Sequence, residues 1–166
     1  VNILDFFDRL VERVIEKKLK IYLLGAEPDV VQKAAGELKK KFHGLEIAGF
    51  HHGFFNGWEE PDIIKEINFL KPHILMVGMG VPKQEKWIYR HLPELDINLC
   101  WAVGAAFDWL AGYRKRAPRW MVNCGLEWLH RLYQEPKRLW KRYLVGNPVF
   151  LYHVWEWKIK RAVDFC

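Results

Sequence analysis

The amino-acid sequence predicts an α/β fold, a parallel sheet with helices on both faces, followed by a basic, aromatic, helical C-terminal appendage. Three observations carry this prediction. Short apolar strand patterns alternate with helical patterns through residues 1–112, glycine stands where two of the strands end, and the composition changes after residue 112. Strand–helix alternation with short connections is typical of parallel sheets with right-handed crossovers.

The body of the chain can be divided into helices and strands in order. Apolar residues at helical spacing predict a helix over 3–17, and Pro28 suits the first turn of a second helix that ends near residue 42. Further helices are expected over 61–70, over 83–91 and from 105 to 110, and strands over 20–25, 45–50, 73–77 and 97–103. A chain of 166 residues that is 51% apolar is long enough to bury a proper core.

The charge distribution separates a body, residues 1–112, from an appendage, residues 113–166. The appendage carries 12 Lys and Arg against 4 Asp and Glu, a net charge of +8, whereas the body has a net charge of −2. Seven of the nine tryptophans lie at or after Trp101. Such a break in composition predicts two zones with different tasks.

The appendage shows helical patterns and no convincing strand pattern. Asn123 is predicted to cap a helix that runs through Tyr133, and Pro136 to start a second helix. Asn147 and Pro148 are predicted to start a third helix, which ends in basic residues that suit a helix C-terminus.

The remaining composition limits the class of protein. Three cysteines without CxxC spacing favour a reducing compartment and argue against a structural zinc site. His51 and His52 lack a third metal ligand nearby, so we expect no metal site. The sequence shows no signal peptide and no apolar run of 18 residues that would span a bilayer. Because it starts with Val1 rather than methionine, we expect it to be a fragment of a longer protein.

Two loop motifs, 76–87 and 103–112, each follow a predicted strand directly, where open α/β sheets bind their ligands. Gly78 and Gly80 could serve a ligand or only make a tight turn. Lys83 could face a pyrophosphate at a helix N-terminus or be a solvated lysine. Gln84 could donate to a sugar or phosphate oxygen. Neither GxGxxG nor GxxxxGK[ST] is present, which argues against classical dinucleotide or P-loop binding.

Two further positions carry candidate side chains. Asp108 stands between Phe107 and Trp109, and a buried carboxylate needs a partner. That partner could be a nearby arginine, in an ordinary salt bridge, or a hydroxyl or base edge of a ligand. Phe54 and the neighbouring Phe55 could belong to the core or stack on a base or sugar ring.

The appendage allows three interpretations. Its cations and aromatic residues could bind nucleic acid, lie on an anionic membrane surface, or pack on the body as amphipathic helices. We favour the membrane, because tryptophan dominates the aromatic residues and no RNP, KH or zinc-finger signature appears. Four cations, each contributing about 1 kcal/mol near anionic lipid, would hold the chain there without a spanning helix. They are Lys137, Arg138, Lys141 and Arg142.

These motifs together resemble those of the WecG/TagA/CpsF family of bacterial glycosyltransferases, and most closely its TagA branch. The matching stretches lie at 78–87, 103–112, 116–120 and 125–136, with Arg138 following, and they stand in the same order at the expected intervals. The Leu24-Gly25 strand end and the loop 53–55 fit as well, so that the resemblance covers nearly the whole chain.

The resemblance implies a Rossmann-like body and an inverting, metal-independent glycosyltransferase without a cofactor. Its partners would be a UDP-linked donor of N-acetylmannosamine or a related sugar and a polyprenyl-diphosphate-linked N-acetylglucosamine acceptor. They would meet at the cytoplasmic face of the bacterial plasma membrane, in the synthesis of wall teichoic acid or a related surface polysaccharide. In this interpretation nucleic acid is not a partner. The alternative interpretation is a non-enzymatic α/β module that binds nucleotide or nucleic acid through the basic appendage. The oligomeric state is open, and a homo-oligomer is possible.

By motif, the resemblance places Gln84 and Asp108 at the nucleotide-sugar, with Phe54 beside them. Arg131 and Arg138 would come from the appendage to stabilise the diphosphate. Lys141 stands where another arginine is expected, and lysine lacks the bidentate fork of a guanidinium. Family members also carry an N-terminal segment before the stretch that matches residues 1–5, with the carboxylate proposed as general base. We therefore expect the chain as given to lack that base and to transfer sugar poorly.

Overall fold

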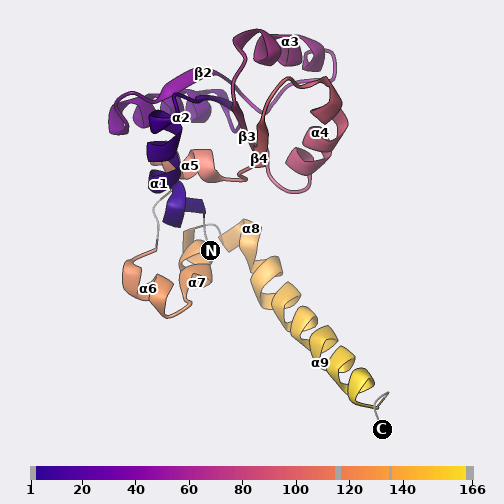
Figure 1. Ribbon diagram of the computed structural model, residues 1–166. Coiled ribbons are helices and arrows are strands. Elements are labelled where there is room, and N and C mark those ends of the chain that lie inside the picture. Colours follow the sequence, from indigo (N-terminus) through magenta and orange to yellow (C-terminus); the bar gives the residue numbers. More distant parts are fainter. Residues whose placement is uncertain (1–2, 115–116, 135, 164–166) are drawn as a thin grey trace. The chain divides into compact units, whose positions relative to one another are not determined.

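The computed structural model describes residues 3–114, 117–134 and 136–163 (Figure 1), and it leaves out the side chains of 3–5, 131, 138, 142–143 and 159–163. The chain divides into two compact units, residues 1–115 and 116–166. Each unit is described by itself.

The first unit contains every helix and strand expected in the body, with ends displaced by no more than two residues. The helices are α1 (Ile3–Glu16), α2 (Pro28–Lys41), α3 (Glu60–Leu70), α4 (Lys83–His91), the short 3-10 helix η1 (Leu92–Glu94) and α5 (Ala106–Leu110). The strands are β1 (Lys20–Gly25), β2 (Glu46–His51), β3 (Ile74–Gly78) and β4 (Leu99–Ala102).

The four strands form one parallel sheet in the order β2-β1-β3-β4. The chain leaves β1 toward β2 on one side and leaves β3 toward β4 on the other, so the connections diverge between β1 and β3. In open α/β sheets this divergence at the carboxyl ends of the strands is the usual place of a ligand. The two strands run in register there, Gly25 opposite Gly78.

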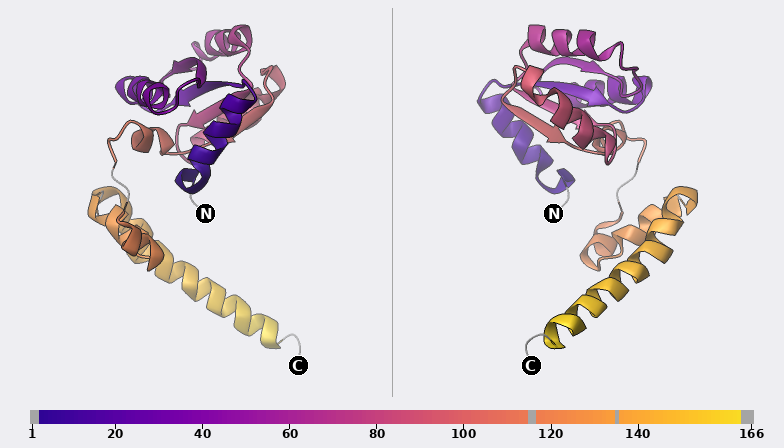
Figure 2. Two further views of the ribbon diagram at one scale, coloured as in Figure 1. Left: turned by 60° about the vertical axis from the view of Figure 1, so that its left-hand side comes forward. Right: turned by 90° about the vertical axis from the view of Figure 1, so that its right-hand side faces the viewer.

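Helices cover both faces of the sheet (Figure 2), as the sequence predicts. Alternate strand residues point to opposite faces. Ile21 and Leu23 of β1 pack with α1, α2 and α5, while Tyr22 and Leu24 pack with α3 and α4. All four side chains are almost completely buried. The α/β, Rossmann-like class expected from the motifs is thereby confirmed.

The second unit consists of helices joined by short turns, and its described residues form no strand. It contains α6 (Arg119–Asn123), α7 (Glu127–Gln134), α8 (Pro136–Trp140), the π-helical segment η2 (Lys141–Gly146) and α9 (Asn147–Val163). The predicted start at Pro136 is confirmed. The predicted cap at Asn123 is wrong, because Asn123 is the last residue of α6 and the next helix begins only at Glu127.

The predicted start of a last helix at Asn147 and Pro148 is confirmed, because α9 begins at Asn147. This α-helix follows the π-helical segment η2 rather than a loop, and Asn147 itself has helical angles, φ −67° and ψ −46° (Figure 2). Proline inside a continuous α-helix crowds the carbonyl of the residue four positions earlier. The wider turns of η2 directly before Pro148 relieve that crowding, so the α-helix can begin there without an intervening loop.

Helix α9 exposes apolar side chains around its circumference. Phe150, Leu151, Trp155 and Trp157 are each more than half exposed. Successive positions of a helix point in different directions, so these apolar groups lie on more than one side of α9. Among the described residues, no helix combines the length and apolar character needed to cross a bilayer.

Candidate functional site

Three glycines close the end of the sheet between β1 and β3. Gly25 has a φ of +136°, and a Cβ atom there would lie 2.4 Å from the carbonyl oxygen of Gly78. A Cβ atom on Gly53 would lie 3.0 Å from the Cα atom of Gly25. The backbone N–H of Ala26 donates to the Gly78 carbonyl at 2.9 Å, and that of Gly53 to the Ala26 carbonyl at 2.8 Å. Only glycine allows the three loops to approach this closely.

Gly80 and Gly104 differ from those packed glycines. Both have positive φ, +80° and +57°, and a Cβ atom at either position would meet no atom within 4 Å. Gly78, by contrast, would clash with the ring of Phe107 at 2.7 Å. Of the two glycines predicted at the site, Gly78 therefore serves packing, whereas Gly80 faces open space in which a ligand could approach the backbone.

Gln84 joins the two loop motifs. Its side chain is only 3% exposed, and its Oε1 accepts a hydrogen bond from the backbone N–H of Gly104 at 3.0 Å. Its Nε2 donates to Oε1 of Glu85 at 2.8 Å. The amide thus ties the loop after β3 to the loop after β4. The Nε2 group carries a second N–H, the donor that a sugar or phosphate oxygen would use.

Lys83 contacts the loop after β2, to which Phe54 belongs. The Lys83 ammonium donates to the carbonyl oxygen of Gly53 at 2.7 Å and stands 5.5 Å from the ring centroid of Phe55. Phe54 is 67% exposed, so it does not belong to the core. Lys83 therefore links the first turn of α4 to this loop, in which the Phe54 side chain is largely exposed.

Asp108 has the ordinary partner that the sequence allowed. Its Oδ2 lies 3.6 Å from Nε of Arg114, and both side chains are about one quarter exposed. The pair is therefore about three quarters buried. A ligand hydroxyl that reached this carboxylate would have to share it with Arg114.

The appendage residues are only partly described. Lys137 and Lys141 are exposed, and the Lys141 ammonium lies 5.7 Å from the ring centroid of Trp140. The side chains of Arg131, Arg138 and Arg142 lie outside the part of the chain that the structure describes. Their predicted contacts with a diphosphate stay predictions.

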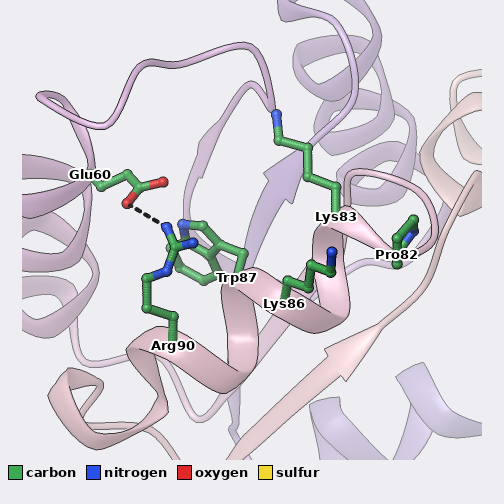
Figure 3. Close-up of a pocket in the computed structure, with 6 residues that line it drawn as sticks. All are labelled: Glu60, Pro82, Lys83, Lys86, Trp87 and Arg90. Atoms are coloured by element: carbon green, nitrogen blue, oxygen red, sulfur yellow. Dashed lines mark ion pairs between the residues drawn. The ribbon is translucent and has the colours of Figure 1, made fainter.

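A pocket on the outer face of α4, with a volume of about 390 Å³, did not follow from the motifs (Figure 3). The side chains that line it come mainly from α4 and its preceding loop, and one comes from the start of α3. They are Glu60, Pro82, Lys83, Lys86, Trp87 and Arg90. The spacing of its cations along α4, at positions 83, 86 and 90, is visible in the sequence, but the concave surface arises only when α3 packs beside α4.

A metal site was not predicted for His51 and His52. The two rings contact each other at 4.4 Å, and Nδ1 of His51 lies 2.9 Å from the carbonyl oxygen of His52. In the residues that the structure covers, no group of three or more His, Cys, Asp or Glu side chains is placed to hold a metal ion.

Comparison with known proteins supplies the remaining evidence. The profile of the glycosyl transferase WecG/TagA/CpsF family matches residues 1–164. The chain belongs to this family. The resemblance seen in the motifs is thereby confirmed.

Two curated relatives carry the name N-acetylglucosaminyldiphosphoundecaprenol N-acetyl-beta-D-mannosaminyltransferase. One, from Staphylococcus aureus (strain MW2), is 34% identical over 145 residues, which make up 86% of this chain and 56% of the relative. The other, from Bacillus subtilis (strain 168), is 35% identical over 142 residues, 84% of this chain and 54% of the relative. The WecG/TagA/CpsF chain therefore spans just over half the length of these relatives, whose names support the TagA-type branch.

Proposed function

We propose that the chain forms the donor-binding and membrane-associating part of an inverting glycosyltransferase. The transferred sugar is N-acetylmannosamine or a close relative, the donor is its UDP derivative, and the acceptor is polyprenyl-diphosphate-linked N-acetylglucosamine. The reaction belongs to wall teichoic acid or related surface-polysaccharide synthesis. The names of the two relatives support the sugar and the acceptor, and the family match supports the reaction class.

One observation carries the proposal for the donor: the Gln84 amide joins both family loop motifs at the carboxyl edge of the sheet. This edge is where open α/β sheets bind nucleotides. Gly80 and Gly104 leave open space for a diphosphate beside the backbone, and Lys83 adds a positive charge at the start of α4. Phe54, largely exposed, is available to stack on the uracil or the sugar.

The chemistry requires charge stabilisation and proton removal. As UDP leaves, negative charge develops on the diphosphate, and fixed cationic donors lower the barrier. We assign this task to Arg131 and Arg138 of the appendage, without a metal ion. The acceptor hydroxyl also needs a base. Asp108 is not assigned as that base, because its motif places it with the donor and it already faces Arg114.

The appendage is proposed to hold the enzyme at an anionic membrane on the cytoplasmic side. Its exposed tryptophans and the exposed Lys137 and Lys141 support this. Aromatic rings settle at headgroup level, while lysine stems lie along apolar surface and keep the ammonium in water. The enzyme would thereby meet its lipid-linked acceptor where that acceptor is confined.

The donor proposal is tested by binding. We expect UDP-N-acetylmannosamine to raise the melting temperature of the chain, and Asp108→Ala to reduce that shift. Single-stranded nucleic acid serves as the opposing ligand, and its binding would fall steeply with salt. A melting temperature raised by nucleic acid and not by the UDP-sugar would replace this function with the nucleic-acid-binding alternative.

The membrane proposal is tested by flotation with vesicles. We expect binding to vesicles that contain phosphatidylglycerol and weaker binding to neutral vesicles. The variant Lys137→Ala/Lys141→Ala should bind the anionic vesicles about thirty-fold more weakly, since each of the two cations contributes about 1 kcal/mol. The matched control Lys39→Ala/Lys40→Ala removes two cations from α2. Equal loss in both variants would contradict a specific role of the appendage.

A further inference from the structure

The pocket on α4 offers hydrogen-bond donors in excess of acceptors (Figure 3). Lys83, Lys86 and Arg90 are cations with no acceptor atoms in their charged groups. The pocket's carboxylate, Glu60, accepts from Nε2 of His91 at 3.0 Å and lies 3.8 Å from the Arg90 guanidinium. Its charge is thus already shared between two neighbours, and the pocket as a whole remains positive.

A buried, unsatisfied donor lies in the wall of this pocket. Trp87 is 4% exposed, and its indole Nε1 has no hydrogen-bond partner. In Figure 3 the indole nitrogen points to the side of the pocket where Glu60 and Arg90 form their ion pair. A guanidinium cannot satisfy an indole N–H, because both groups are donors. A buried donor without an acceptor costs about 1–3 kcal/mol, which a ligand oxygen would relieve once a side-chain movement uncovers the nitrogen, now fully covered.

The size of the pocket selects among anions. Positions 83 and 90 are seven residues apart on α4, which separates them by about 10 Å along the helix axis. A volume of about 390 Å³ also exceeds what a single phosphate fills. Two linked phosphates can reach cations on successive turns, and the remaining space accommodates the group attached to them.

The pocket also adjoins the carboxyl edge of the sheet. Lys83 lines the pocket and at the same time donates to the carbonyl of Gly53, which packs against Gly25 between β1 and β3. Arg90 is 67% exposed, and its 3.8 Å pair with Glu60 is too long for a hydrogen bond. The guanidinium can therefore turn to a ligand at little cost.

We propose that this pocket is a binding site for a diphosphate group, held by Lys86, Arg90 and the Trp87 indole N–H, with Lys83 at its inner end. The preference for an anion rests on the pocket itself. The choice of a diphosphate also rests on the proposed function, in which both the nucleotide-sugar and the lipid-linked acceptor carry one. Nothing in the sequence motifs assigns Lys86, Trp87 or Arg90 to either substrate.

The test follows the Trp87 indole N–H by ¹H–¹⁵N NMR of the full chain, with the signal assigned through Trp87→Phe. We expect inorganic pyrophosphate at low salt to shift this signal, and Lys86→Ala/Arg90→Ala to weaken the apparent affinity at least ten-fold. The matched control, Lys65→Ala/Arg13→Ala, removes two exposed cations from other helices and should leave the titration unchanged. A stationary indole signal at saturating pyrophosphate, or equal loss in both double variants, overturns the site.

Two more titrations identify the source of the diphosphate. UDP represents the donor, and farnesyl diphosphate represents the prenyl-linked acceptor. One of the two ligands should shift the Trp87 signal at a lower concentration, with the same dependence on Lys86 and Arg90. That ligand identifies the substrate that binds in the pocket. A chain that responds to pyrophosphate in this way but does not bind a UDP-sugar retains the site and refutes the proposed donor binding, so that the two failures are distinguishable.

Discussion

Replacing Gln84 tests whether its amide holds the candidate site together. In Gln84→Ala the partly buried backbone N–H of Gly104 loses its acceptor at 3.0 Å, and a hydrogen bond of this kind contributes about 0.5–1.5 kcal/mol. The bond to the partly solvated Glu85 adds up to about 1 kcal/mol. We expect the free energy of unfolding to fall by about 0.5–2.5 kcal/mol. For a chain of this size, that corresponds to a melting temperature lower by about 1–10 °C.

Two companion variants separate the hydrogen bonds from other effects. Gln84→Met keeps an unbranched side chain of similar volume but makes neither bond, so it should lose nearly as much stability as Gln84→Ala. Gln32→Ala removes an exposed glutamine from α2 and should change the free energy of unfolding by less than about 0.5 kcal/mol.

Urea unfolding gives the free energies, and hydrogen exchange gives the local effect. The Gly104 amide should exchange slowly in the parent chain and much faster in Gln84→Ala, since only the variant leaves it without an acceptor. If that amide exchanges equally in both proteins, or if Gln84→Ala and Gln32→Ala unfold alike, the linking role of Gln84 is refuted.

Other predictions concern the glycines, the core and the cysteines. Gly25→Ala should lower the free energy of unfolding by about 2–5 kcal/mol, because it adds an atom 2.4 Å from a carbonyl oxygen at a φ of +136°. Gly36 lies on α2, where an added Cβ atom meets open space. In the same urea assay Gly36→Ala should therefore raise the free energy of unfolding by about 0.5–1 kcal/mol. Tyr22→Phe removes a 2.9 Å hydrogen bond to a carboxylate of α3, and calorimetry should show a loss of about 1–2 kcal/mol. Burial raises the pKa of the Cys100 thiol to about 11, so this thiol stays protonated at pH 8. It should therefore react with iodoacetamide far more slowly than the exposed Cys124. Mass spectrometry of digested samples measures the labelling of each cysteine. Equal labelling of the two cysteines in the folded chain would contradict that burial.

The sequence determined the elements of the first unit and the place of its ligand site. Period-two and period-3.6 patterns report which residues are buried, and burial is what fixes strands and helices in an α/β fold. Glycine directly after β3 and β4 marked the edge where the family motifs meet. The same local reasoning failed at Asn123, because a capping residue only permits a helix start. It succeeded for the start of α9 at Asn147, but it did not predict the π-helical turns of η2 before that start.

The tertiary structure alone decided which loop residues pack and which remain open. Gly78 and Gly80 look alike in the sequence, yet one lies against Phe107 and the other faces space. The contact between Gln84 and Gly104 joins residues 20 positions apart, and the α4 pocket needs Glu60 from a different helix. Such relations depend on distances in space between segments remote in the chain, which no local pattern of residues encodes.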